Sequence, residues 1–271
     1  MRRFPFYVAM LLCLCPGRYA CAAMDVFVSI APQKYLVQRI GGDRVRVEVM
    51  LKPGHSPETY DPSPSQVARL ASTRIYFLIG VPFESRWHAR FQQQNGAMHM
   101  VDSVRDCSII DQNPHVWTSP VNAQYIATVI RDTLMQEDPA GASYYAANFR
   151  RLVADLEGLD KDIQARLRHR RTDYFIVSHD AWSYYAARYG LEQLALESGG
   201  REKGPRGIAQ LVEQARRENI QVVFIQSQHP TGAALTLARE LHAGVVEIDP
   251  LAPDYISNLR RVTASIAQTL Q

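Results

Sequence analysis

Short apolar segments alternate with longer amphipathic stretches along most of the chain. Apolar runs predict strands at 26–30, 45–51 and 75–79, with a helix from 64 to 70 before the third strand. The alternation restarts after a long helical region, with predicted strands at 174–177, 194–197, 222–225 and 245–248. Strands that alternate with helices are typical of parallel sheets, because a parallel crossover needs a long connection. The pattern therefore predicts an α/β protein built from two similar halves.

The region between the halves carries a single apolar stripe. Its members are Tyr145, Phe149, Leu152, Leu156, Leu159, Ile163 and Leu167. Their spacings of three and four residues are the period of one face of an α-helix. A helix over 142–169 would be roughly 42 Å long at about 1.5 Å per residue. We expect a rigid helix over 141–170 that joins an N-terminal lobe of residues 23–140 to a C-terminal lobe of residues 171–271.

Residues 1–22 have the order of a secretory signal peptide. Arginines at positions 2 and 3 precede an apolar run over 4–15, and small residues surround Ala22. The run is shorter than the roughly 20 residues that a membrane-spanning helix needs. We therefore expect cleavage after Ala22 and an exported protein, in the periplasm or associated with the cell envelope. Cys21 leaves lipidation open as an alternative.

Composition narrows the class of protein further. The net charge of +3 comes from 30 basic and 27 acidic residues, and the one basic cluster, 166–171, lies at the end of the predicted long helix. Cations are favourable at a helix C-terminus, so we expect no nucleic-acid partner. Three of the four cysteines fall in or beside residues 1–22, which leaves Cys107 without an intramolecular disulfide partner. We expect a monomer stabilised by buried apolar surface.

Imidazoles and carboxylates follow the predicted strands in both halves. A proline-rich loop after 45–51 carries His55 and Glu58, His115 precedes a helix that begins near position 120, His179 follows 174–177, and Asp249 follows 245–248. Open α/β sheets bind ligands at the carboxyl ends of their strands, so a cleft between two lobes can gather such side chains around one ion. Nitrogen and oxygen ligands without thiolate suit Zn²⁺, and Mn²⁺ accepts a larger share of oxygen.

Four segments resemble, in order, the metal-site motifs of the zinc and manganese receptors of bacterial ABC importers, the ZnuA/TroA-like solute-binding proteins. The segments are 53–64, Asn-Pro-His-Val-Trp at 113–117, Ser-His-Asp-Ala-Trp at 178–182, and Ile-Asp-Pro-Leu at 248–251. The resemblance implies two α/β lobes joined by a long helix, a metal ion in the cleft between them, and delivery of that ion to the membrane permease of a metal ABC importer. It implies ligand roles for His115, His179 and Asp249.

The first motif departs from the family pattern and leaves two candidates for its ligand. Glu58 stands in a Pro-Glu-Thr-Tyr run where many members have histidine, and His55 lies three residues earlier. Register favours Glu58, which would give two imidazoles and two carboxylates and would tolerate manganese as well as zinc. His55 would instead give three imidazoles and favour zinc. His229, after 222–225, faces the same sheet edge but lies outside the four motifs, so we expect it not to bind.

A secreted metallohydrolase on an α/β scaffold is the competing function. Such an enzyme keeps one metal position open for water and places a general base nearby, a role that Glu58 or Asp180 could take. The chain has no GxSxG nucleophile motif. A receptor for an organic ligand such as chelated iron would need a pocket lined by aromatic residues or arginine. We therefore expect a receptor without enzymatic activity that binds a divalent transition metal, zinc first and manganese next.

Overall fold

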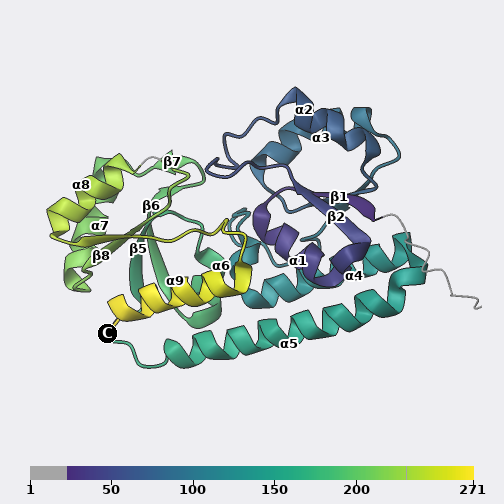
Figure 1. The fold of residues 1–271 in the computed structure, drawn as a ribbon. Coiled ribbons are helices and arrows are strands. Elements are labelled where there is room, and N and C mark those ends of the chain that lie inside the picture. Colours follow the sequence, from purple (N-terminus) through teal and green to yellow (C-terminus); the bar gives the residue numbers. More distant parts are fainter. Residues whose placement is uncertain (1–22, 230) are drawn as a thin grey trace, which may run out of the picture.

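Two α/β lobes lie side by side over a long helix in the computed structural model, which describes residues 23–229 and 231–271 (Figure 1). The predicted signal peptide, 1–22, falls outside the described residues. No helix of the described part is both long and apolar enough to cross a membrane.

The N-terminal lobe contains a four-stranded sheet in which all strands are parallel, in the order β2-β1-β3-β4. The strands are β1 Met24–Val28, β2 Val45–Val49, β3 Ile75–Leu78 and β4 His99–Asp102. The helices of this lobe are α1 Ala31–Gly41, α2 Pro64–Arg69, α3 Pro82–Gln94 and α4 Pro120–Glu137. In Figure 1, α2 and α3 lie on one side of the sheet, and α1 and α4 lie on the other. The predicted strands of this half are confirmed to within about two residues, and β4 is an addition.

The C-terminal lobe contains a five-stranded sheet in the order β7-β6-β5-β8-β9. The strands are β5 Tyr174–His179, β6 Glu192–Ser198, β7 Arg201–Glu202, β8 Val222–Ile225 and β9 Gly244–Glu247. The helices are α6 Ser183–Tyr189, α7 Pro205–Arg217, α8 Gly232–Leu241 and α9 Tyr255–Thr269.

One strand of this sheet corrects the expectation of purely parallel pairing. β7 pairs antiparallel with β6, because the chain reverses through Gly199 and Gly200. Their φ angles of 57° and 74° lie in the left-handed region that glycine adopts without steric cost.

The two faces of the sheet in the C-terminal lobe pack into different apolar cores. Ile176 of β5 and Val223 of β8 pack with α7 and α8 in a separate small core. Their neighbours Phe175, Val177 and Phe224 join a larger core that also contains most of the N-terminal lobe. Successive residues of a strand point to opposite faces, so the alternation in these strands divides the two cores. One continuous apolar core therefore extends across both lobes.

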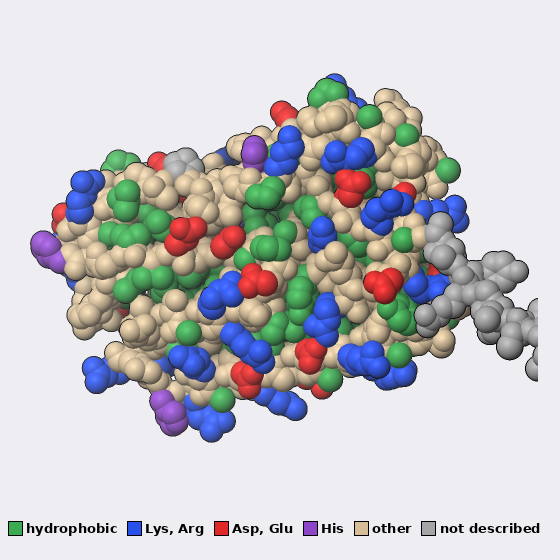
Figure 2. All heavy atoms as spheres, in the orientation of Figure 1, with side chains coloured by type: hydrophobic (Ala, Val, Ile, Leu, Met, Phe, Trp, Pro, Cys, Tyr) green, Lys and Arg blue, Asp and Glu red, His purple; other side chains and the backbone are tan. Residues whose placement is uncertain are grey.

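The long helix α5, Ala142–Arg166, packs against α1, α4 and α9 and so contacts both lobes. It begins one residue after the start and ends four residues before the end of the expected helix, 141–170, and its apolar stripe faces the core. At the surface, Arg39 of α1 pairs with Asp155 of α5 at 2.6 Å, and Arg260 of α9 pairs with Asp162 at 3.1 Å. Figure 2 shows basic and acidic side chains interspersed over this face.

Candidate metal site

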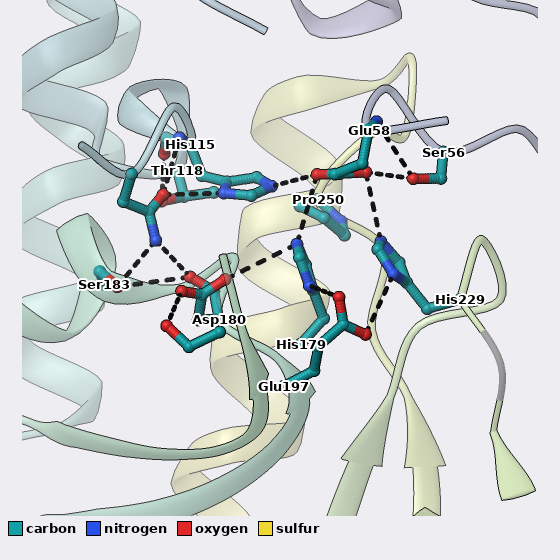
Figure 3. Close-up of polar contacts among 12 residues, drawn as sticks. Ser56, Glu58, His115, Thr118, His179, Asp180, Ser183, Glu197, His229 and Pro250 are labelled. Atoms are coloured by element: carbon teal, nitrogen blue, oxygen red, sulfur yellow. Dashed lines mark hydrogen bonds and ion pairs between the residues drawn. The ribbon is translucent and has the colours of Figure 1, made fainter. Parts of the chain in front are cut away.

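Four potential ligands converge where the two lobes meet (Figure 3). Glu58 comes from the loop after β2 and His115 from the segment before α4. His179 is the last residue of β5, and His229 follows β8. Glu58 Oε1 lies 3.8 Å from His115 Nε2 and 3.5 Å from His179 Nε2, and Glu58 Oε2 lies 3.7 Å from His229 Nε2. One carboxylate thus faces three imidazole nitrogens.

The loop that carries Glu58 directs its carboxylate inward. Gly54 adopts a φ of 77°, and the backbone N–H of Glu58 donates to Ser56 Oγ at 3.3 Å. The Ser56 hydroxyl in turn donates to the Glu58 carboxylate. Arg86 of α3 donates to the backbone carbonyl of Glu58 at 3.0 Å, which holds the loop from outside.

His55, the alternative first ligand, points away from this cluster. Its side chain is exposed, and its Nδ1 lies 3.1 Å from the carbonyl oxygen of Pro53. Its ring meets the edge of Tyr60 with the centroids 5.5 Å apart. The structure therefore brings Glu58, and not His55, to the histidines.

The local structure around His115 orients its ring. Asn113 Oδ1 accepts hydrogen bonds from His115 N at 2.9 Å and from His115 Nδ1 at 2.8 Å. An amide oxygen only accepts, so Nδ1 carries the proton and Nε2 keeps its lone pair for a metal. Trp117, fully buried beside this ring, donates from Nε1 to the carbonyl of Pro250 at 2.8 Å. This bond joins the segment before α4 to the C-terminal lobe.

His179 and His229 form a parallel pair. Their ring centroids are 3.9 Å apart and their planes differ by 18°. His179 is 2% exposed and His229 is 9% exposed, yet both nitrogens of His179 and the Nε2 of His229 have no hydrogen-bond partner among the described residues. Buried polar atoms without partners are costly, and a cation bound at the Nε2 side would satisfy the two Nε2 atoms.

Burial and neighbouring charges shift the pKa values of the four candidate ligands in different directions. Burial alone would raise the pKa of Glu58, but the close approach of the His179 ring and the hydrogen bond from the Ser56 hydroxyl lower it to about 2. Burial lowers the pKa of His115 to about 3, so this imidazole is neutral near pH 7. Burial and the neighbouring His179 lower the pKa of His229. For His179 burial acts in the same direction but is outweighed by Glu58, and the net pKa is raised.

Two aspartates lie near the cluster with different surroundings. Two groups of possible ligands occur among the described residues: Glu58 with His179 and His229, and Asp180 with His115 and His179. Asp180 Oδ1 is 3.8 Å from His179 Nε2. Asp249 belongs to neither ligand group found among the described residues. Its Oδ1 accepts from the backbone N–H of Leu251 at 2.8 Å and from Gln228 Nε2 at 3.0 Å. Asp249 thus fixes the residue that precedes His229.

The chain matches a known protein family over almost all of its described residues. The family model described as zinc-uptake complex component A, periplasmic (ZnuA), matches residues 26–269. The chain belongs to the ZnuA family. A crystal structure of a ZnuA deletion mutant with zinc bound is 36% identical, with a TM-score of 0.89, and the match covers 92% of this chain and 98% of that one.

Curated relatives of this ZnuA-family chain carry different metals in their names. The high-affinity zinc uptake system protein ZnuA of Bacillus subtilis is 24% identical over 81% of this chain and 76% of its own. The iron-binding protein YfeA of Yersinia pestis is 27% identical over 86% of this chain and 82% of its own. The family resemblance inferred from the four motifs is confirmed. The relatives named here are metal-binding or metal-uptake proteins, and they give no support to a metallohydrolase.

His229 was expected not to bind because it lies outside the four motifs. The available signal was its position after the strand 222–225, at the same sheet edge as His179. β8 pairs directly with β5, so the loops that follow these two strands are neighbours. The sequence shows a histidine after each of these two predicted strands, but the adjacency of the two strands is known only from the sheet.

Proposed function

We propose that the chain is an extracytoplasmic solute-binding protein that captures one divalent transition-metal ion between its lobes and delivers it to the permease of an ABC importer. The observation that carries the proposal is the meeting of three imidazole Nε2 atoms around the Glu58 carboxylate, with two ligands from each lobe. Membership of the ZnuA family supports the transport role. Export to the periplasm or cell envelope, and action as a monomer without catalysis, belong to the same proposal.

We propose zinc as the cargo ion, with manganese second. Glu58, His115, His179 and His229 offer three nitrogens and one carboxylate, which is a donor set suited to tetrahedral Zn²⁺. Manganese prefers a shell richer in oxygen, which this cluster reaches only if Asp180 also binds. In this proposal His229 supplies the third imidazole, which His55 would have supplied in the alternative that the sequence left open.

A site composed of four protein ligands also argues against hydrolysis. A catalytic zinc keeps one position open for water, whereas a closed four-ligand shell leaves none. Glu58 is a member of the cluster and lies between the three histidines, so it is not placed as a separate general base.

Titration of chelator-treated protein with zinc and with manganese tests this function. We expect one equivalent of zinc to bind and to raise the melting temperature, because a metal that binds only the folded state stabilises it by roughly 4 kcal/mol at a thousandfold excess over the dissociation constant. His88→Ala, on the exposed face of α3, is a matched control that removes a histidine away from the site. Melting temperatures that neither ion changes would contradict the proposal.

A further inference from the structure

A second carboxylate faces His179 and His229 from the side opposite Glu58. Glu197 Oε1 lies 3.5 Å from His179 Nδ1, and Glu197 Oε2 lies 3.7 Å from His229 Nδ1. Because the two rings stack nearly parallel, both Nε2 atoms face Glu58 while both Nδ1 atoms face Glu197 (Figure 3). The imidazole pair therefore lies between two carboxylates, and each carboxylate offers one oxygen to each ring.

The position of Glu197 follows from the sheet. β5 and β6 are parallel neighbours, and His179 is paired in register with Glu197. Partners on adjacent parallel strands point to the same face, so Glu197 lies beside His179. Its side chain is 17% exposed, and in the described part of the chain its ion-pair partners are these two imidazoles, with no lysine or arginine among them.

We propose that Glu197 is the positioning residue of the metal site: in the metal-loaded protein its carboxylate, which lies 3.5 Å from His179 Nδ1 and 3.7 Å from His229 Nδ1 here, accepts from the Nδ1–H of both rings and so directs both Nε2 lone pairs to the metal. The inference rests on the proposed metal-binding function. A neutral imidazole carries one proton, and the hydrogen bond made by one ring nitrogen determines which nitrogen can bind a metal. A carboxylate is suited to this role because both of its oxygens accept.

The amide of glutamine cannot replace this carboxylate. In Glu197→Gln one side-chain atom still accepts from an Nδ1–H, but the other becomes an NH₂ group that donates. The ring facing that NH₂ must then accept at Nδ1 and carry its proton on Nε2, where it blocks metal binding. A substitution that preserves shape and burial therefore removes one ligand.

The test compares Glu197→Gln with Glu202→Gln by chelator-competition titration of zinc. Glu202 is an exposed residue of β7 whose backbone is paired with that of Glu197, so its substitution removes a neighbouring charge without touching either ring. We expect Glu197→Gln to weaken zinc binding roughly 10- to 100-fold, while the metal-free variant still melts cooperatively as a folded protein. Glu202→Gln should bind as the wild type does. Equal zinc affinities in both variants would overturn the role of Glu197.

A second measurement does not depend on a variant that folds. Nitrogen NMR of the imidazoles in the zinc-loaded wild type should show Nδ1–H and metal-bound Nε2 in both rings. Zinc bound through Nδ1 in either ring would overturn the proposal. If the wild type binds no zinc, the proposed function is contradicted. If the wild type binds zinc and Glu197→Gln binds it equally well, only the positioning role is contradicted.

Discussion

Two hydrogen bonds join Asn113 to His115, because the amide oxygen of Asn113 accepts from both the backbone N–H and the ring Nδ1 of His115. The amide nitrogen of the same side chain donates to the backbone carbonyl of Asp180 at 2.8 Å. Asp180 belongs to the C-terminal lobe, whereas His115 is a candidate ligand contributed by the N-terminal side. One asparagine therefore orients a candidate ligand and also joins the two lobes at the site.

Replacing Asn113 with alanine should weaken zinc binding. The Nδ1 of His115 would lose its acceptor, and ring orientation would no longer be fixed, so we expect a loss of roughly 10- to 100-fold in affinity. Asn148→Ala is the matched control, because Asn148 Nδ2 also donates to a backbone carbonyl, that of Ile40, at 3.0 Å but between α5 and α1. Equal zinc affinities of the two variants, measured by chelator competition, would contradict this role of Asn113.

His229 and Asp249 give opposite expectations for the fourth ligand. We expect His229→Ala to lose most zinc affinity, because the substitution removes one nitrogen from the shell. Asp249→Asn should bind zinc nearly as the wild type does, because its amide oxygen can still accept from Leu251 and Gln228. The reverse order in isothermal titration would assign the ligand role to Asp249, as the family motif implies.

The first motif can be tested in the same way. Glu58→Ala should lower metal affinity by more than His55→Ala, because the carboxylate faces three imidazoles and the His55 ring is exposed. Glu58→His should shift the preference further toward zinc over manganese, since it exchanges the one oxygen ligand for nitrogen. Loss of binding in His55→Ala but not in Glu58→Ala would reverse the assignment.

The sequence predicts the helices and strands better than it predicts the set of candidate metal ligands. Apolar runs such as 222–225 identify buried strands because side-chain burial leaves a local pattern. β4 was missed because its four residues, His99–Asp102, have only one fully buried side chain. β7 depends on the positive φ angles of Gly199 and Gly200, which a glycine pair permits but does not require.

The set of candidate metal ligands depends on contacts between residues that are far apart in the chain. The proline-rich loop and the family register favoured Glu58 over His55, and the structure brings Glu58 to the histidines. The stacking of His179 on His229 and the contact of Glu197 with both rings follow from the order in which β6, β5 and β8 pair. Strand order is a property of the assembled sheet, so no local pattern in the sequence reports it.

Zinc affinity should fall as the pH is lowered. Burial lowers the pKa of His179, but the close carboxylate of Glu58 and the charges of Asp180 and Glu197 give a net pKa above the usual 6.5. Below this raised pKa zinc must displace a proton, so affinity should fall about tenfold per pH unit. Glu58 and His115, with pKa values of about 2 and about 3, do not titrate near neutral pH.

The raised pKa of His179 has the opposite effect on the stability of the metal-free protein, which should increase as the pH is lowered. The stability contributed by protonated His179 is present below pH 6.5 and is lost as the pH rises through the raised pKa. Dissociation constants for zinc, measured between about pH 5 and 8, test the pH dependence of the affinity. Melting temperatures of the metal-free protein over the same range test the pH dependence of its stability. A zinc affinity that does not change over this range would contradict the assignment of His179 as a ligand.

X-ray absorption at the zinc edge tests the central claim most directly, because it reports the ligands of the bound ion. For the zinc-loaded wild type the account predicts three imidazole nitrogens at about 2.0–2.1 Å and one carboxylate oxygen. His229→Ala, loaded under the same conditions, should lose one imidazole from the shell. A wild-type shell with two imidazoles, or a spectrum that His229→Ala leaves unchanged, would contradict the account.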